Sequence, residues 1–315
     1  MNPLPSPQQL RYVLALAEHR HFGRAAAACA VTQSTLSTGV QALERLLDAD
    51  LLDRESGRRV VFTRLGEEIV ERARTALAAL EAVPEAAAAA RAPMSGPLRL
   101  GVIPTIGPFL LPRLMPVLRA RFPQLRLFLR EDTTDRLIAR LDAGRLDLLL
   151  LALPCECGTA DTMPVLRDEF LVALPPGHPL AELDRIAPAA LETERLLLLE
   201  DGHCLRDQVL AACGRLRQHE PDGFAATSLH TLVQMVAGHL GVTLVPRLAV
   251  SCGLVAGTGI VLRPLDGAGG WRSLGLAWRP GAPRAAEYRA LGQVLSGLAA
   301  DPAASPLPTA ITEAA

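Results

Sequence analysis

The sequence predicts a chain of three parts: a small, mainly helical N-terminal domain that ends in a β-hairpin, a long connecting helix, and a larger α/β domain of two lobes. Three features predict this. Apolar residues recur at helical spacing over residues 8–47, one long amphipathic stretch follows, and from Leu98 onward short apolar runs of strand length alternate with helical segments. A length of 315 residues suits two or three domains.

The first domain is expected to occupy residues 1–65. A helix around residues 10–17 precedes a short helix of small residues at 22–29 and a third helix from Gln33 to about Leu47, for which Thr32 is the expected N-cap. The turn at 56–59 and the β-branched run at 60–63 predict a hairpin.

The spacing of residues 22–47 is that of a helix-turn-helix, in which the second helix enters the major groove of DNA. Glutamine, serine and threonine at the start of that helix can bond to base edges, and nearby arginines can reach phosphates. The residues expected to contact DNA are Gln33, Ser34, Thr35, Ser37 and Thr38, with Arg24, Arg54, Arg58 and Arg59. The alternative is a small helical bundle with a solvated face.

Residues 66–96 are expected to connect the domains. A helix should begin near Arg64 and end near Val83, with an apolar stripe of Leu65, Ile69, Val70, Ala73, Leu77 and Leu80. Such a stripe forms either the core of its own domain or a dimer seam. Pro84 and the alanine-rich run after it predict a hinge-like connection.

The larger domain is expected at 97–300. Strands at 98–102, 125–130 and 146–153 alternate with helices at 108–121 and 132–143, which predicts a parallel sheet with helices on both faces. A second alternating region starts at 170–174 and includes a strand at 195–199, a helix capped by Ser228, and strands at 242–245 and 260–264. A strand at 274–278 and a helix at 284–298 should return to the first lobe. Lobe I is thus about 97–167 with 273–300, lobe II about 168–272, and 301–315 a disordered tail.

The most informative stretch is Glu200–Gln208, in which Cys204 lies between a histidine and Leu205-Arg206, with Cys213 nine positions later. The neighbouring basic side chains favour the nucleophilic thiolate form, and Cys213 could resolve a sulfenic acid. If residues 204–213 are helical, the two Cα atoms lie about 13 Å apart, whereas a disulfide tolerates only about 7 Å. Oxidation could then join them only by breaking the helix. The alternative is that both thiols are buried packing residues.

Composition limits the remaining possibilities. The net charge is −1, and all 32 basic residues are arginines. No apolar run approaches the roughly 20 residues that span a bilayer, and no signal pattern begins the chain, so we expect a cytoplasmic protein without a membrane partner. Cys29, Cys155, Cys157 and Cys252 are expected to be structural or incidental, and the alternative for the closely spaced Cys155 and Cys157 is a second redox or metal-binding role. No phosphate loop, metal-ligand cluster or nucleophile elbow is present, which predicts no cofactor, no metal and no enzyme activity.

Several motifs resemble the LysR-type transcriptional regulators: Phe22-Gly23-Arg24-Ala25-Ala26, Thr32-Gln33-Ser34-Thr35-Leu36-Ser37 and Thr63-Arg64-Leu65-Gly66. The resemblance extends to about residue 300. It implies a winged helix-turn-helix, a linker helix and a two-lobed effector domain of the periplasmic-binding-protein type. Within that family, Ser95–Thr105 and Leu199–Gln208 resemble the peroxide-sensing members.

This resemblance implies that hydrogen peroxide oxidises Cys204 and that Cys213 then forms a disulfide with it. The refolding would reorient the subunits of a homodimer or homotetramer on double-stranded promoter DNA and recruit RNA polymerase. The peroxide pocket would contain Thr105, Thr134, His203 and Arg279. Thr105 could instead cap the next helix, and the pocket threonine could be Thr133. The chain could also sense a metabolite between the lobes, or be a thiol-dependent enzyme that consumes peroxide.

Overall fold

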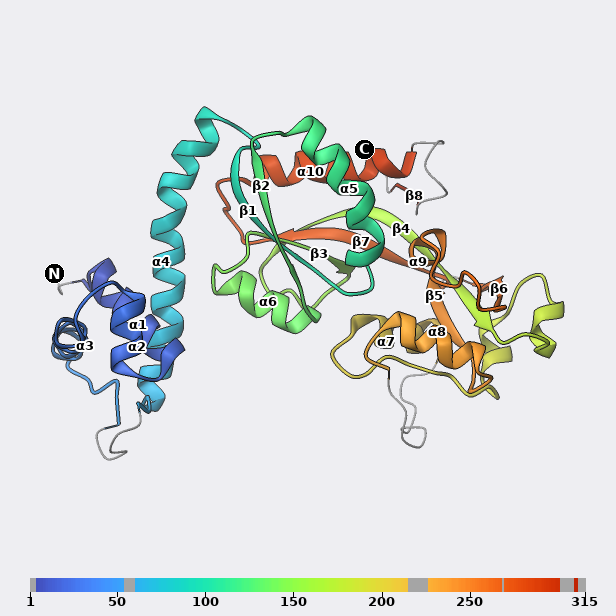
Figure 1. Ribbon diagram of the computed structural model, residues 1–315, viewed down its shortest axis with the longest axis horizontal. Helices are drawn as coiled ribbons and strands as arrows, with labels where there is room; N and C mark the ends of the chain where they lie inside the picture. The colour runs from blue at the N-terminus through green and yellow to red at the C-terminus, as the bar shows by residue number, and fades with distance from the viewer. Residues whose placement is uncertain (1–3, 54–59, 215–225, 268, 301–308, 311–315) are drawn as a thin grey trace. The chain divides into compact units, whose positions relative to one another are not determined.

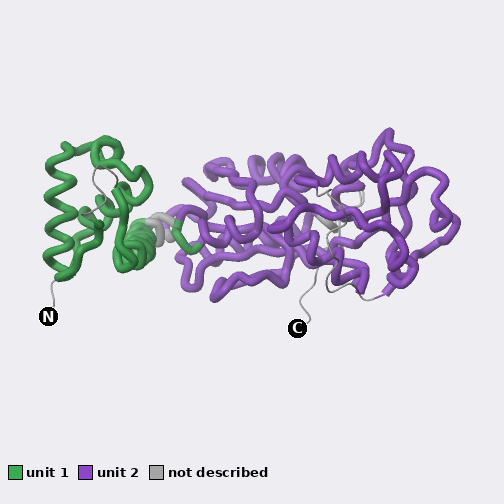
Figure 2. The backbone as a smooth tube through the Cα atoms, turned by 90° about the horizontal axis from the view of Figure 1, so that it is seen from below, with its two compact units in different colours: residues 1–90, 142–144 green, residues 91–141, 145–315 purple. Residues whose placement is uncertain are grey.

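The computed structural model describes residues 4–53, 60–214, 226–267, 269–300 and 309–310. The chain divides into two units, one of residues 1–90 with 142–144 and one of 91–141 with 145–315 (Figure 2). Each is described by itself.

The N-terminal unit contains the helices expected from the sequence: α1 (Pro7–His19), α2 (Phe22–Ala28) and α3 (Gln33–Leu47) (Figure 1). Ser6 begins α1 with a capping box, in which its hydroxyl accepts from the Gln9 N–H and its own N–H donates to the Gln9 side chain. Thr32 caps α3, as predicted, by accepting from the Thr35 N–H at 3.2 Å. An antiparallel bridge between Leu52 and Phe62 forms the base of the hairpin.

The linker helix is longer than predicted. Helix α4 (Arg64–Arg91) continues through Pro84 instead of ending at Val83. The reason is that alanine has the highest helix propensity, so the run after Pro84 offsets the one backbone hydrogen bond that a proline removes. The predicted hinge at Pro84 is therefore corrected to continuous helix.

The two halves of the apolar stripe of α4 differ in burial. Val70, Ala73 and Leu77 are buried in the core of the N-terminal unit. Leu80 and Val83, one and two turns further on, are 47% and 67% exposed. The first half of the stripe thus belongs to the domain core, and the second half presents apolar side chains that the unit itself does not cover.

The larger unit is built on a sheet with the strand order β2-β1-β3-β7-β4-β5. Strands β1 (Gly96–Val102), β2 (Leu125–Glu131) and β3 (Leu148–Leu153) are parallel, and α5 (Gly107–Arg121) and α6 (Thr134–Asp142) connect them as predicted. Helices α5 and α10 (Ala285–Ala300) lie on one side of this sheet and α6 on the other (Figure 1).

Two long antiparallel strands, β4 and β7, connect lobe I to lobe II. Strand β7 (Trp271–Trp278) pairs with β3 and with β4 (Asp161–Leu174), whose far end pairs with β5 (Thr243–Pro246) and β6 (Val261–Pro264). Only the last part of β4, residues 170–174, was predicted as strand. The sequence pattern missed its first half because five of the seven residues 161–167 are partly or fully exposed.

Lobe II also contains α7 (Cys204–Ala212), α8 (Leu229–Ala237) and α9 (Arg247–Ser251). Ser228 caps α8 as predicted. The strand predicted at 195–199 is present only as isolated bridges at Leu196 and Leu199. Within the tail expected to be disordered, Thr309–Ala310 pairs with β4 as the short strand β8.

Candidate functional site

Cys204 is the first residue of α7. Gly202 has φ +89, a left-handed conformation that glycine adopts without strain, and it turns the chain so that His203 becomes the N-cap. The first N–H groups of a helix have no intrahelical partner and favour negative charge beside them. The local sequence therefore places a half-exposed thiol at the end of a helix that suits an anion.

Cys213 lies at the opposite end of the same helix, as its C-cap, and is 2% exposed. Neither thiol forms a disulfide in this structure. Residues 204–212 are helical, which meets the condition set in the sequence analysis, so nine steps of rise separate the Cα atoms of Cys204 and Cys213 by about 13 Å. A bond between them requires α7 to unwind.

A narrow void, with no room for a water-sized molecule, lies against Cys204. Three chain segments meet around it: the end of β1, the start of α6 and the start of α7. Its lining consists of Ile103, Pro104, Thr105, Thr133, Thr134, Gly202, His203 and Cys204. The structure thus brings Cys204 together with three of the four residues expected around it, and the void is lined from both lobes.

Thr134 presents a hydroxyl that has no hydrogen-bond partner among the described residues, although its oxygen is buried. A buried hydroxyl without a partner destabilises a protein by about 1–3 kcal/mol. Thr133 lines the same void, so both threonines of the pair remain candidates for contact with a small molecule there.

Thr105 is 2% exposed and accepts hydrogen bonds from a buried arginine, Arg272. Arg272 Nη1 donates to Thr105 Oγ1 at 2.9 Å, and Nη2 donates to the Thr105 carbonyl at 3.0 Å. Ile106 rather than Thr105 is the N-cap of α5, and it makes no side-chain cap. The capping role considered for Thr105 is therefore not what the structure shows.

Arg272 also pairs with Asp168, which is fully buried on β4. Arg272 Nε donates to Asp168 Oδ2 at 3.0 Å, and the Leu248 N–H donates to Oδ1 at 2.9 Å. Burial raises the pKa of Asp168, while the positive charge of Arg272 acts in the opposite direction. The network links the void to both long strands that join the lobes.

Arg279 does not line the void. It follows β7, and its guanidinium donates to the carbonyls of Leu141 and Leu146 at 2.6 Å each, which anchors the end of α6. The expectation for Arg279 is thus corrected: the arginine that contacts a pocket residue is Arg272. Its signal in the sequence was a single cation in the otherwise uncharged strand Trp271–Trp278.

The other basic neighbours of Cys204 have defined partners. His203 is 7% exposed, and its Nε2 lies 3.9 Å from Glu200. Arg206 forms an ion pair with Asp201 at 3.0 Å and donates to the Leu199 carbonyl at 3.1 Å. Arg206 therefore fixes the loop that leads into α7.

The residues expected to meet DNA lie at the N-terminus of α3. Gln33, Ser34, Thr35 and Thr38 are exposed, and Ser37 is half-buried. The hydroxyl oxygens of Ser34 and Thr35 lie 2.9 Å and 2.8 Å from Oγ1 of Thr32. Arg24 is exposed and donates to the His19 carbonyl. Arg54, Arg58 and Arg59 lie outside the described residues.

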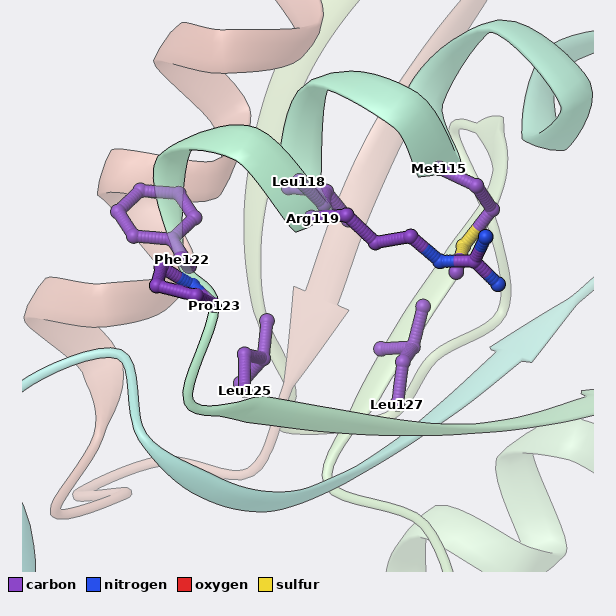
Figure 3. Close-up of a pocket in the computed structure, with 7 residues that line it drawn as sticks. All are labelled: Met115, Leu118, Arg119, Phe122, Pro123, Leu125 and Leu127. Carbon is purple, nitrogen blue, oxygen red and sulfur yellow. The ribbon is translucent and has the colours of Figure 1, made fainter.

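Other features of the chain offer less support for a ligand site. A cavity of about 270 Å³ between α5 and β2 is lined by lobe I alone: Met115, Leu118, Arg119, Phe122, Pro123, Leu125 and Leu127 (Figure 3). No group of three or more potential metal ligands occurs in the described part of the chain. Among the described helices, none combines the length and the apolar character needed to span a membrane.

Comparisons with known proteins identify the class. Residues 7–67 match the family of bacterial regulatory helix-turn-helix proteins of the lysR type, and residues 91–299 match the LysR substrate binding domain. Together the two matches cover most of the chain. It belongs to the LysR family of transcriptional regulators.

Within this family, similar proteins include OxyR and hydrogen peroxide-inducible genes activators. The chain is 43% identical to the transcriptional dual regulator OxyR of Escherichia coli K12 over 288 residues, which covers 91% of this chain and 94% of that protein. It is 39% identical over 291 residues to the hydrogen peroxide-inducible genes activator of Haemophilus influenzae, covering 92% and 95%.

Solved structures agree. A full-length OxyR variant from Pseudomonas aeruginosa is similar with a TM-score of 0.77 and 35% identity, covering 99% of this chain and 100% of that one. A peroxide-bound OxyR variant from Corynebacterium glutamicum has a TM-score of 0.64 and 33% identity, covering 95% and 94%. The fold predicted from the sequence is confirmed.

Proposed function

We propose that this chain is a peroxide-responsive transcriptional regulator in which Cys204 is the reactive thiol and Cys213 its resolving partner. The observation that carries the proposal is the position of Cys204, at the start of α7 and against a narrow void lined by threonines from the facing lobe. The name of the Haemophilus influenzae relative, a hydrogen peroxide-inducible genes activator, supports the same oxidant.

The chemistry is balanced. The Cys204 thiolate attacks one oxygen of hydrogen peroxide, which forms sulfenic acid and releases hydroxide that becomes water on protonation. The Cys213 thiol then attacks the Cys204 sulfur, which forms the disulfide and releases a second water. A leaving hydroxide needs nearby donors, and the threonine hydroxyls of the void can supply hydrogen bonds.

The size of the void favours peroxide over a metabolite. Sites for small organic ligands enclose about 300–1,000 Å³, whereas the void beside Cys204 has no room for a water-sized molecule and would have to open less for peroxide than for a metabolite. The alternative, a regulator that senses a metabolite between the lobes with inert cysteines, requires a larger opening than this one.

The effect of oxidation on DNA binding follows from the unwinding of α7. Formation of the disulfide unwinds α7, and lobe II must repack because Cys213 and Val209 belong to its core. This repacking would reorient the subunits of a cytoplasmic homodimer or homotetramer on promoter DNA, which α3 reads, and recruit RNA polymerase. The exposed Leu80 and Val83 of α4 offer apolar surface for subunit contact.

The test is a stoichiometric pulse of hydrogen peroxide on reduced, full-length protein, followed by tryptic mapping. Cleavage after arginine puts Cys204 in peptide 196–206 and Cys213 in 207–215. We expect these peptides to become linked within seconds, and not in Cys204→Ser. Unmodified cysteines would instead support the metabolite sensor, and steady consumption of excess peroxide with a thiol reductant would support an enzyme.

A further inference from the structure

The sequence places two further thiols, Cys155 and Cys157, in a segment that the function proposed above does not use. The structure joins them in a disulfide, with Cα atoms 5.1 Å apart. That separation falls within the usual range of disulfides, about 4.4–6.8 Å. The expectation that they are incidental therefore needs revision.

The pair lies on the connection between β3 and β4. Both strands run antiparallel to β7, so they are parallel to each other, and residues 154–160 must carry the chain back along the sheet. Leu153 pairs with Ser273, and Asp161 pairs with Trp278 at the other end of β7. The pair therefore lies directly before the strand that carries Asp168 into lobe II.

The two sulfurs differ in access. Cys157 is 6% exposed and belongs to the hydrophobic core, whereas Cys155 is half-buried at its edge. An incoming thiol or disulfide can therefore reach Cys155 first, because thiol–disulfide exchange depends on access to the sulfur that reacts.

A purely stabilising or metal-binding role fits less well. The bridge spans a sequence separation of 2, and closing so short a loop removes little entropy from the unfolded chain. Among the described residues, no third metal ligand joins the two thiols. In the reducing compartment proposed above, disulfides are usually transient and redox-active.

We propose that Cys155 and Cys157 form a second, reversible redox couple, which exchanges with small disulfides and dithiol reductants independently of Cys204 and Cys213. In oxidation, the Cys155 thiolate attacks a small disulfide RSSR, which forms a mixed disulfide and releases RS⁻. The Cys157 thiolate then attacks the Cys155 sulfur and releases a second RS⁻. The two protein thiols lose two protons and two electrons, and RSSR becomes two RSH. Dithiol reductants reverse both steps.

The experiment uses the full-length protein with Cys204→Ser and Cys213→Ser, so its result does not depend on the peroxide mechanism. The protein is equilibrated anaerobically with mixtures of reduced and oxidised dithiothreitol, quenched with acid, alkylated and digested. Tryptic peptide 146–167 contains Cys155 and Cys157 and no other cysteine. We expect it to change from doubly alkylated to unlabelled and two hydrogens lighter, in one reversible transition.

A trapping step checks the order of attack. With bis(2-hydroxyethyl) disulfide, Cys157→Ser is expected to accumulate a mixed disulfide on Cys155 at least tenfold faster than Cys155→Ser accumulates one on Cys157. Cys252→Ser, which removes an exposed thiol outside the pair, should leave the dithiothreitol transition unchanged.

Three results would overturn the proposal. The first is peptide 146–167 remaining doubly alkylated in every mixture, and the second is a bridge that dithiothreitol reduces only in urea. The third is a bridge from Cys155 or Cys157 to another peptide. Failure of the peroxide mechanism would be seen separately, as the absence of a link between 196–206 and 207–215 in the wild-type protein.

Discussion

Arg272 holds Thr105 by two hydrogen bonds, one to its hydroxyl and one to its carbonyl, and thereby fixes the threonine that faces Cys204 across the void. The same guanidinium is paired with Asp168 on the neighbouring strand. The geometry of the void therefore depends on a charge pair buried between two strands that both lobes share.

Arg272→Lys is expected to slow oxidation of Cys204. Lysine keeps the positive charge beside Asp168 but cannot make the forked hydrogen bonds of a guanidinium. Loss of two bonds to Thr105, at about 0.5–1.5 kcal/mol each, corresponds to roughly tenfold in rate. The rate of Cys204 oxidation can be measured by mixing the protein with peroxide in a stopped-flow instrument and labelling the remaining thiols.

The matched control is Arg279→Lys, which alters an arginine on the Leu141 and Leu146 carbonyls. It should leave the oxidation rate within twofold. An equal slowing in both variants would show that Arg272 has no specific role. Arg272→Ala is a poorer test, because an unpaired buried carboxylate destabilises a protein by about 3–5 kcal/mol.

Thr134→Val should have opposite effects on stability and on sensing. Its hydroxyl oxygen is buried without a partner among the described residues, so an isosteric methyl group should raise stability by about 1 kcal/mol. For a domain of this size that is roughly 2–4 °C in the melting temperature. If the hydroxyl binds peroxide, oxidation of Cys204 should slow at the same time.

Thr133→Val separates the two neighbouring threonines. Slower oxidation in Thr133→Val with an unchanged rate in Thr134→Val would assign the peroxide contact to Thr133. Calorimetry and the same labelling assay provide both measurements.

Ala211→Gly is expected to speed closure of the Cys204–Cys213 disulfide. Ala211 is exposed near the end of α7, and glycine lowers helix stability there by about 1 kcal/mol without removing core contacts. If α7 unwinds before the bond forms, closure should be about fivefold faster. Trapping the sulfenic acid with dimedone at timed intervals measures the rate.

Ala79→Gly, an exposed alanine in α4, serves as the control and should not change closure. Closure at the wild-type rate in Ala211→Gly would mean that the rate-limiting step precedes unwinding of the helix.

Asp132→Asn should lower stability in a pH-dependent way. Burial alone would raise the pKa of Asp132, but hydrogen bonds from Arg130 and the Thr133 N–H, with the charges of Arg130 and Arg136, hold the pKa below its usual value. A lowered pKa in the folded state contributes stability above the unfolded value, about 3.9 for aspartate, and that contribution is lost as the pH falls through the lowered value.

The melting temperatures of wild type and Asp132→Asn should therefore differ at neutral pH and converge below pH about 4. In an Arg130→Gln and Arg136→Gln background the difference should shrink at neutral pH, because two of the three arginines paired with the carboxylate are gone and only Arg140, at 3.7 Å, remains. A difference that is constant across pH would exclude the electrostatic cause.

Gly39→Ala should destabilise the DNA-binding unit. A Cβ at this position of α3 would lie 2.7 Å from Cε2 of the Tyr12 ring and closer still to Cδ2, and Tyr12 is buried at 5% exposure. The resulting overpacking should exceed the gain in helix propensity and reduce stability by about 1–3 kcal/mol, with weaker binding to DNA. Gly297→Ala in α10, where nothing lies within 4 Å, is the control and should not destabilise.

Local signals accounted for most of the secondary structure. The caps at Thr32 and Ser228 and the helical spacing of apolar residues located α3 and α8 to within a residue, because caps and periodicity are properties of neighbours along the chain. The same kind of reading failed at Pro84, where proline is normally a breaker and the alanines on either side kept the helix intact.

The sequence by itself determined the order of the modules and singled out Cys204 and Cys213 as the reactive pair, and its resemblance to the LysR-type regulators predicted that Thr105, Thr134 and His203 lie beside Cys204. Tertiary structure alone decided that Arg272 rather than Arg279 reaches this site. The hydrogen bond from Arg272 to Thr105 joins residues 167 positions apart, and it depends on the register of β7 against β3 and β4. Such a register is fixed by pairing across the sheet, which neighbouring residues along the chain do not encode.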